Sequence, residues 1–258
     1  MNELKFDGKG KIYSMFRPSY PKMFIEYLHS GISINKSSII ADIGSGTGKL
    51  TQLLLGIGKK VFAVEPNDDM RGFAETEFKD NVKFVSVNAT AENTTLEDSS
   101  VDFITVAQAF HWFDRERFKD ECKRILKPIG KVILVWNTRE IISAPMEDYE
   151  TIIRKHCPDF EGFSGRKISA LYNETGVKNE NDFSEFLNGN YEIKTFPNDL
   201  LNDLESFIGG ALSASYAPKE QDNNYSAFVA DLTTCFNKHS INNKITIPFT
   251  TKSFSGSV

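Results

Sequence analysis

The residues with the clearest potential for chemistry form a glycine-rich stretch, Asp42-Ile43-Gly44-Ser45-Gly46-Thr47-Gly48. The stretch follows a short apolar run that predicts a buried strand, and it precedes a run that predicts a helix. Glycines at such a junction let the backbone approach a ligand closely, because no Cβ stands in the way. Open α/β sheets bind ligands at this kind of place. We expect Asp42 to organise the loop by accepting backbone N–H bonds.

The spacing of these glycines distinguishes between kinds of nucleotide site. The dinucleotide fingerprint is G-x-G-x-x-G, and Lys49 occupies the place of its third glycine. A P-loop ends in Gly-Lys followed by Ser or Thr, but here Leu50 follows and Ile43 stands where the loop's first glycine belongs. Both phosphate-binding interpretations are therefore weakened. Glu65 ends the next predicted strand, about 20 residues past the glycines, which suits a bidentate bond to two ribose hydroxyls.

Length and composition limit the class of protein. The 258 residues are 40% hydrophobic and 25% charged, which predicts one large globular domain or a domain with an insertion. The net charge of −5 disfavours a general nucleic-acid binder. The three cysteines lie far apart with no C-x-x-C pair, so neither a metal site nor a disulfide framework is expected. The start shows no secretory signal, and no run of about 18 apolar residues predicts a membrane span, so we expect a cytoplasmic protein.

The elements that must position these residues alternate along the first half of the chain. Strands are predicted at 38–43, 60–65, 82–87, 101–107 and 131–136. Helices are predicted between them, at 23–28, 48–55, from 67 onward, and at 114–126. Mostly apolar strands that alternate with helices indicate an α/β fold with a parallel, doubly wound sheet covered on both faces.

The alternation stops after Thr138. Residues 140–188 look helical and more polar, with 149–153 and 168–172 as the clearest pieces. A strand at 191–196, helices at 199–212 and 218–238, and a strand at 244–251 are then predicted, and Pro248 places this last strand at an edge or a bulge. We therefore expect an N-terminal lid and cofactor-binding part at 1–139, an inserted helical cap at 140–189, and a remainder at 190–258 that completes the sheet.

The glycine loop resembles the first motif of the class I S-adenosylmethionine-dependent methyltransferases, which reads acidic, apolar, G-x-G-x-G. Glu65 matches the acidic ribose ligand of that family, and the stretch 90–92 matches its adenine-side loop. The stretches 107–114 and 13–21 resemble a small-molecule subgroup of the type 11 kind. The resemblance covers roughly residues 12–138 and, weakly, the final strand. It implies a Rossmann-like sheet of seven strands whose last strand is antiparallel.

The resemblance also implies the cofactor, S-adenosyl-L-methionine, and the residues that would hold it. Gly44, Gly46 and the Ser45 backbone would hold its methionine part, and Glu65 the ribose. Many relatives carry Asp where Thr90 stands, and Thr can accept a hydrogen bond there without a charge. The other implied positions are Pro66 beside the ribose ligand, Met70 against the adenine, Ala91 with its N–H on the adenine edge, and Gln108 at the sulfonium end.

His111 is the candidate catalytic residue, because an imidazole titrates near operating pH and can act as a general base. The alternative is that His111 and Trp112 only form a packed wall at the mouth of the site. Methyl transfer from a sulfonium often needs no strong base, so in-line positioning can supply much of the rate. The chain has 21 phenylalanines. An apolar acceptor pocket would be sought at Phe110, Phe113 and the aromatics of the expected cap, Tyr149 among them.

The remaining candidates lie on the substrate side. Tyr13, Arg17 and Tyr20 resemble a lid that folds over the cofactor and excludes water, with simple N-terminal packing as the alternative. Arg17 could also pair with a substrate carboxylate. Tyr216 could reach the substrate or could only join two helices.

The predicted function is transfer of a methyl group from S-adenosylmethionine to a small molecule by in-line displacement. Methylation of RNA or protein is the first alternative, which the acidic charge and the absence of an Asn-Pro-Pro-aromatic signature at 108–111 disfavour. A nicotinamide oxidoreductase and a non-catalytic cofactor-binding module are the others. We expect no membrane partner, and the sequence leaves the acceptor, the methylated atom and the oligomeric state open.

Overall fold

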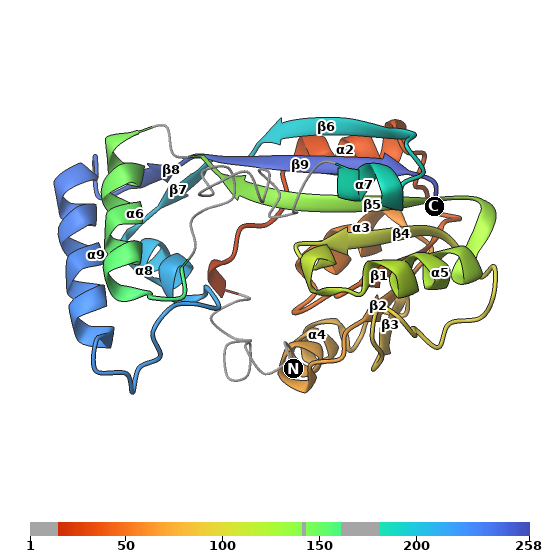
Figure 1. Cartoon of the computed structure of the whole chain (residues 1–258), viewed down its shortest axis with the longest axis horizontal. Coiled ribbons are helices and arrows are strands. Elements are labelled where there is room, and N and C mark those ends of the chain that lie inside the picture. The colour runs from red at the N-terminus through yellow and green to blue at the C-terminus, as the bar shows by residue number, and fades with distance from the viewer. Residues whose placement is uncertain (1–14, 141–142, 161–180) are drawn as a thin grey trace.

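A seven-stranded sheet forms the centre of the computed structural model, which describes residues 15–140, 143–160 and 181–258 (Figure 1). Its strands, in spatial order, are β3 (Phe84–Val87), β2 (Lys60–Val64), β1 (Ile39–Ile43), β4 (Val101–Ala107), β5 (Leu126–Arg139), β9 (Phe249–Gly256) and β6 (Tyr191–Pro197). The first five run parallel, and β9 runs antiparallel to both β5 and β6. The predicted doubly wound, mostly parallel sheet with an antiparallel last strand is confirmed.

Helices cover both faces of this sheet. The helices α2 (Lys22–Ser30), α3 (Lys49–Ile57) and α4 (Asp68–Phe78) supply one buried cluster, and α5 (Arg115–Ile125) and α7 (Asn181–Phe186) supply the other. The strand β5 serves both clusters: Ile133 and Val135 join the first, whereas Val132 and Leu134 join the second. Successive side chains of a strand point to opposite faces, so an almost continuous apolar strand belongs in the middle of a covered sheet.

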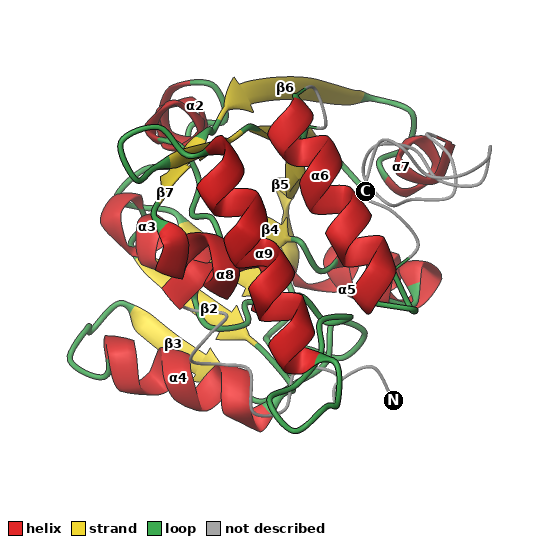
Figure 2. Ribbon diagram, turned by 90° about the vertical axis from the view of Figure 1, so that its left-hand side faces the viewer, coloured by secondary structure: helices red, strands yellow, loops and turns green. Residues whose placement is uncertain are grey.

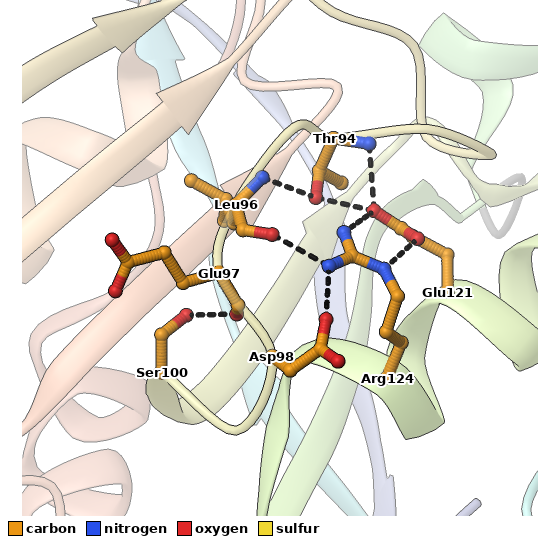
Figure 3. A network of polar contacts seen from close by, with 7 residues as sticks. All are labelled: Thr94, Leu96, Glu97, Asp98, Ser100, Glu121 and Arg124. Atoms are coloured by element: carbon orange, nitrogen blue, oxygen red, sulfur yellow. Dashed lines mark hydrogen bonds and ion pairs between the residues drawn. The ribbon is translucent and has the colours of Figure 1, made fainter.

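Polar side chains fix the helix starts and the long connection before β4. Asn67 accepts from the Met70 N–H at 2.9 Å and caps α4, as asparagine often does at the start of a helix. Figure 3 shows a second network, in which Glu121 of α5 accepts from the Thr94 N–H (2.7 Å) and Arg124 donates to the Leu96 carbonyl (2.7 Å) and to Glu121. The chain between β3 and β4 is thus fastened to α5.

A helical cap lies beside the sheet and has its own apolar core. We use this name for α6 (Ala144–His156), α8 (Leu204–Leu212), α9 (Tyr225–His239) and the two-stranded sheet of β7 (Leu200–Asn202) and β8 (Ile245–Ile247). Figure 2 shows α6 and α9 packed side by side. In Figure 1 the long strands β5 and β9 run from the sheet toward the cap.

Two segments of chain build this cap. The helix α6 comes from the expected insertion at 140–189, whereas α8 and α9 come from the segment expected to complete the sheet. The helix α7, also within 140–189, packs Phe183 and Phe186 into the core of the sheet. The piece at 168–172 lies outside the described residues, and the domain boundaries stay a prediction. The expected helix at 199–212 begins with β7, and Pro248 separates β8 from β9 because it interrupts the strand.

Two matching polar clusters join α6 to α9. Asp148 of α6 accepts from Lys238 at 2.6 Å and lies 2.7 Å from the His239 Nε2. Asp231 of α9 accepts from Lys155 at 2.7 Å and lies 2.8 Å from the His156 Nε2. Each helix therefore gives one carboxylate to a Lys-His pair on the other, and both neighbours lower the pKa of each carboxyl.

Candidate functional site

The glycine loop leaves β1 in a conformation that requires its glycines. Gly44, Gly46 and Gly48 have φ of 65°, 57° and 83°, a left-handed region that other residues rarely adopt. A Cβ on Gly44 would come within 2.6 Å of Ala109, and one on Gly48 within 2.4 Å of the Phe78 ring. A Cβ on Gly46 would meet no atom within 4 Å. The first and third glycines therefore serve packing, while Gly46 faces open space.

Asp42 does not accept from the loop as expected. It is buried, and its carboxylate accepts from the Thr51 hydroxyl on α3 at 2.6 Å and from the Thr105 hydroxyl on β4 at 2.7 Å. Burial raises the pKa of Asp42 to about 6, against the lowering effect of these hydrogen bonds. Asp42 thus fastens the helix and the strand beneath the loop, because both of its oxygens are directed there.

Glu65, at the end of β2, holds the tip of the glycine loop. Its Oε2 accepts from the Gly46 N–H and its Oε1 from the Asn67 N–H, both at 2.9 Å. The side chain is 8% exposed. The sequence places an acidic group here but gives no sign of its bond to Gly46, which is nineteen residues earlier. A carboxylate has about four acceptor positions, so holding the loop is compatible with the predicted bond to ribose hydroxyls.

A cavity of about 290 Å³ opens beside the loop. It brings together the predicted residues Gly44, Ser45, Gly46, Gln108, His111, Trp112, Arg17, Tyr20 and Tyr216. Its other walls come from α3, the end of β5, α6, α8 and the start of β9. One hollow therefore extends from the glycine loop to the helical cap.

The predicted adenine-side residues lie away from this cavity. Met70 and Ala91 are buried in the protein, and Thr90 is exposed and bridged to Asn93. Pro66 accepts from Arg71 through its carbonyl at 3.2 Å. None of them is among the described residues that line the cavity. Their contacts with adenine stay predictions.

His111 and Trp112 stand in the cavity wall on the 3-10 turn η2 (Phe110–Trp112), with ring centroids 4.5 Å apart. Loss of hydration, and secondarily the Arg115 guanidinium, lower the pKa of His111 to about 4. His111 is nevertheless exposed in the cavity wall. Because its pKa is lowered, its imidazole is uncharged at neutral pH. Phe110, in contrast, is wholly buried against other rings and does not line the pocket that was sought there.

The segment before α2 forms another wall. Arg17 donates to the Ser213 carbonyl at 3.2 Å, and the Ser19 carbonyl accepts from Asn198 at 2.8 Å. Tyr20 is buried at the end of the segment. Tyr13 lies outside the described residues, so the lid of Tyr13, Arg17 and Tyr20 stays a prediction.

One residue near the end of a central strand, Asn137, was not found from the sequence as a site residue. Asn137 donates to the Ser19 carbonyl at 3.1 Å and accepts from Thr251 at 2.6 Å. Gln108, a predicted residue, donates to the Asn137 carbonyl at 3.1 Å and has a left-handed φ of 60°. Such a conformation in a residue other than glycine is often stabilised by its surroundings at a functional site. Asn137 was missed because two of its partners, Ser19 and Thr251, lie more than 100 residues away in the sequence.

The cap side of the cavity holds further residues, of which sequence reasoning missed Arg139 and Phe249. The Arg139 Cζ lies 4.4 Å from the ring centroid of Tyr149 and 5.2 Å from that of Phe249. Burial, as the main cause, raises the pKa of Tyr216, while Arg139 and Arg17 act to lower it. The sequence predicted Tyr149 only as an aromatic residue of the cap and Tyr216 only as a possible substrate contact.

Comparison with known proteins identifies a methyltransferase domain within the chain. Residues 41–134 match a family profile described as a methyltransferase domain. An uncharacterized methyltransferase-like protein of Schizosaccharomyces pombe is 35% identical over 161 residues, which cover 62% of each chain. A protein of Saccharomyces cerevisiae described as a probable S-adenosylmethionine-dependent methyltransferase is 31% identical over 122 residues, 46% of this chain and 42% of that protein. The chain thus spans less than two thirds of the length of these relatives.

The fold is shared with solved structures. A protein of Anaeromyxobacter dehalogenans assigned as a type II methyltransferase superposes with a TM-score of 0.65 at 18% identity, covering 94% of this chain and 98% of the other.

Within the described residues no helix is long and apolar enough to cross a membrane, and no group of His, Cys, Asp and Glu side chains could hold a metal ion. The chain contains a methyltransferase domain and is a homologue of the S-adenosylmethionine-dependent methyltransferases.

Proposed function

We propose that the chain transfers a methyl group from S-adenosylmethionine to a small-molecule acceptor. The observation that supports this most is the single cavity that joins the glycine loop to the aromatic and cationic residues of the cap. The methyl donor would lie against the loop, and the acceptor would lie toward the cap. A cavity of about 290 Å³ is near the lower end of ordinary ligand pockets, at about 300–1,000 Å³, which favours a small acceptor.

The residues around the loop fit the methionine end of this cofactor. The Gly46 backbone is open to the cavity side, where a side chain would otherwise stand. The Ser45 and Thr47 hydroxyls are buried at the same place without a hydrogen-bond partner in the described part of the chain. Buried polar groups are nearly always hydrogen-bonded, so a ligand or a water molecule would satisfy these two hydroxyls. When bound, S-adenosylmethionine would supply an activated methyl group with a neutral leaving group.

The protein's own part in this reaction is mainly to bind and orient. Gln108 and His111 stand in the wall of the cavity, and we propose that they position the acceptor. His111 remains the candidate general base, but a group with a pKa of about 4 is a weak one at neutral pH. Orientation and exclusion of water would then account for most of the rate enhancement.

Isothermal titration calorimetry with S-adenosylmethionine, S-adenosylhomocysteine and NAD tests the cofactor assignment. We expect heat from the first two ligands and none from NAD. Absence of heat from both adenosyl ligands would refute the proposed function. A screen of small molecules, RNA and protein with a labelled methyl donor then separates an enzyme from a binding module and names the acceptor class.

A pair of glycine variants gives a matched control. Gly46 and Gly56 both have open space for a Cβ, but only Gly46 has a left-handed φ. Gly46→Ala should weaken S-adenosylhomocysteine binding by tenfold or more, about 1.4 kcal/mol, because it strains the loop and fills its open face. Gly56→Ala should leave the affinity unchanged. Equal affinities in the two variants would remove Gly46 from the cofactor site.

A further inference from the structure

The charged side chains among the described residues of the cavity wall are all positive. Among the described residues that line it, Arg17, Lys49 and Arg139 are cationic, and no aspartate or glutamate is present. Cations gathered around a small, partly dehydrated hollow attract an anionic guest. The wall is therefore suited to a negatively charged ligand, in a chain whose net charge is −5.

Arg139 lies far from the glycine loop, at the end of the cavity that we assign to the acceptor. β4 lies between β1 and β5, so Arg139 is two strands away from the glycine loop, about 10 Å across the sheet. The register pairs Ala107, the last residue of β4, with Val135. Arg139 is four residues further along β5, about 13 Å beyond the end of β4. Lys49 instead follows the glycine loop directly and is the cation at the cofactor's end.

Two rings hold the Arg139 guanidinium in place. It lies 4.4 Å from the Tyr149 centroid and 5.2 Å from the Phe249 centroid, and its backbone pairs with Phe249 across β5 and β9. A guanidinium that stacks by its face keeps its N–H donors in the plane, where a carboxylate or phosphate binds in a bidentate manner. The stacking fixes the side chain before any ligand arrives.

Tyr216 and Arg17 lie near the same place. Tyr216 lines the same cavity as Arg17 and Arg139, and its phenol, which is protonated at neutral pH, can donate a hydrogen bond. Arg17 is fixed by its bond to the Ser213 carbonyl, three residues before Tyr216. Donors from three separate segments thus approach one end of the cavity.

We propose that this end of the cavity binds an oxyanion of the methyl acceptor, a carboxylate or a phosphate, through Arg139 and Tyr216, with Arg17 beside them. The inference rests on the proposed function, because it assigns the opposite end to the cofactor. The acceptor is then a small acid, and the bound oxyanion orients it toward the methyl donor.

The test uses the full chain saturated with S-adenosylhomocysteine. Benzoate, succinate and phenyl phosphate are titrated beside the neutral analogues benzamide, succinamide and phenol, with calorimetry and thermal shift as readouts. We expect at least one anion to bind about tenfold or more tightly than its neutral analogue, as charge-assisted hydrogen bonds would give. The anions that bind distinguish a carboxylate from a phosphate site. If no anion is preferred over its neutral analogue, the inference is wrong.

Variants locate the site. Arg139→Met should weaken binding of the preferred anion about tenfold or more, and Tyr216→Phe about two- to tenfold, while S-adenosylhomocysteine affinity changes less than twofold. Arg154→Met is the matched control, because Arg154 also lies over a ring, 5.3 Å from the Phe160 centroid, but does not line the cavity. Equal anion binding by Arg139→Met and Arg154→Met would overturn the inference, as would an equal loss of cofactor affinity in Arg139→Met. Failure of the wild type to bind S-adenosylhomocysteine would instead refute the proposed function.

Discussion

Asp42→Asn should change how the stability of this protein depends on pH. Burial raises the pKa of Asp42 in the folded chain to about 6, from 3.8 for an accessible carboxyl. The folded state therefore binds this proton more tightly than the unfolded state. The stabilisation of the folded state by this proton is fully present below pH 3.8 and is lost as the pH rises through about 6. The asparagine variant has no such proton, so its stability lacks this dependence.

The size of the effect follows from the shift. A difference of about 2.2 pKa units corresponds to about 3 kcal/mol, and linkage places about 2 kcal/mol of it between pH 4.5 and 7.5. Asparagine has nearly the same shape, and the hydroxyls of Thr51 and Thr105 can rotate to accept from its amide. Urea unfolding of both proteins at several pH values gives the free energies, and the two end points lie on either side of the pI of about 5.5.

We expect the free energy of unfolding of Asp42→Asn, minus that of the wild type, to rise by about 2 kcal/mol from pH 4.5 to 7.5. Glu121→Gln is the matched control, because Glu121 is also buried but hydrogen bonds from Arg124 and Thr94 lower its pKa. That carboxylate stabilises the fold above its unfolded pKa, so this difference should fall as the pH rises. A difference for Asp42→Asn that stays constant with pH, or falls, would refute the reasoning.

The remaining predictions concern the site, the cap and the core. Glu65→Ala should weaken S-adenosylhomocysteine binding by about 1.5–3 kcal/mol in calorimetry, and an unchanged affinity would remove Glu65 from the cofactor site. Asp148→Asn and Asp231→Asn should each lower the free energy of unfolding by about 0.5–1 kcal/mol. The double variant should lose their sum, since the clusters lie about 12 Å apart along α6; a clear departure would show coupling. Phe110→Ala should cost about 3–5 kcal/mol in urea unfolding without changing acceptor preference, and a changed preference would return Phe110 to the pocket.

The conformation of the glycine loop could be predicted because its determinants are local. Three glycines within five residues mark a backbone that needs positive φ, and the structure shows it at Gly44, Gly46 and Gly48. Glu65 could be placed because it ends a short apolar strand. Its bond to the Gly46 N–H could not, since it depends on how β1 and β2 lie side by side.

The cap could not be predicted as a unit, because its core comes from distant segments. Met146, Tyr149 and Ile153 of α6 pack with Phe228 and Leu232 of α9. Each helix shows its own apolar positions, but no local pattern says which helix will cover them. The helix α7 is the opposite case. It lies within the segment that was expected to form the cap, but it packs on the sheet.

The cap side of the cavity was the part of the site that the sequence predicted least. Arg17, Arg139, Tyr149, Tyr216 and Phe249 line the cavity from five separate segments, and all of them lie outside the methyltransferase profile at 41–134. The glycine loop, with Gln108 and His111, lies inside it. The profile therefore covers the glycine loop and the two residues proposed to position the acceptor, but none of the cap-side residues named above. The residues proposed to bind the oxyanion of the acceptor all lie in segments that the profile does not cover, so the substrate class is inferred from the charge and shape of those walls.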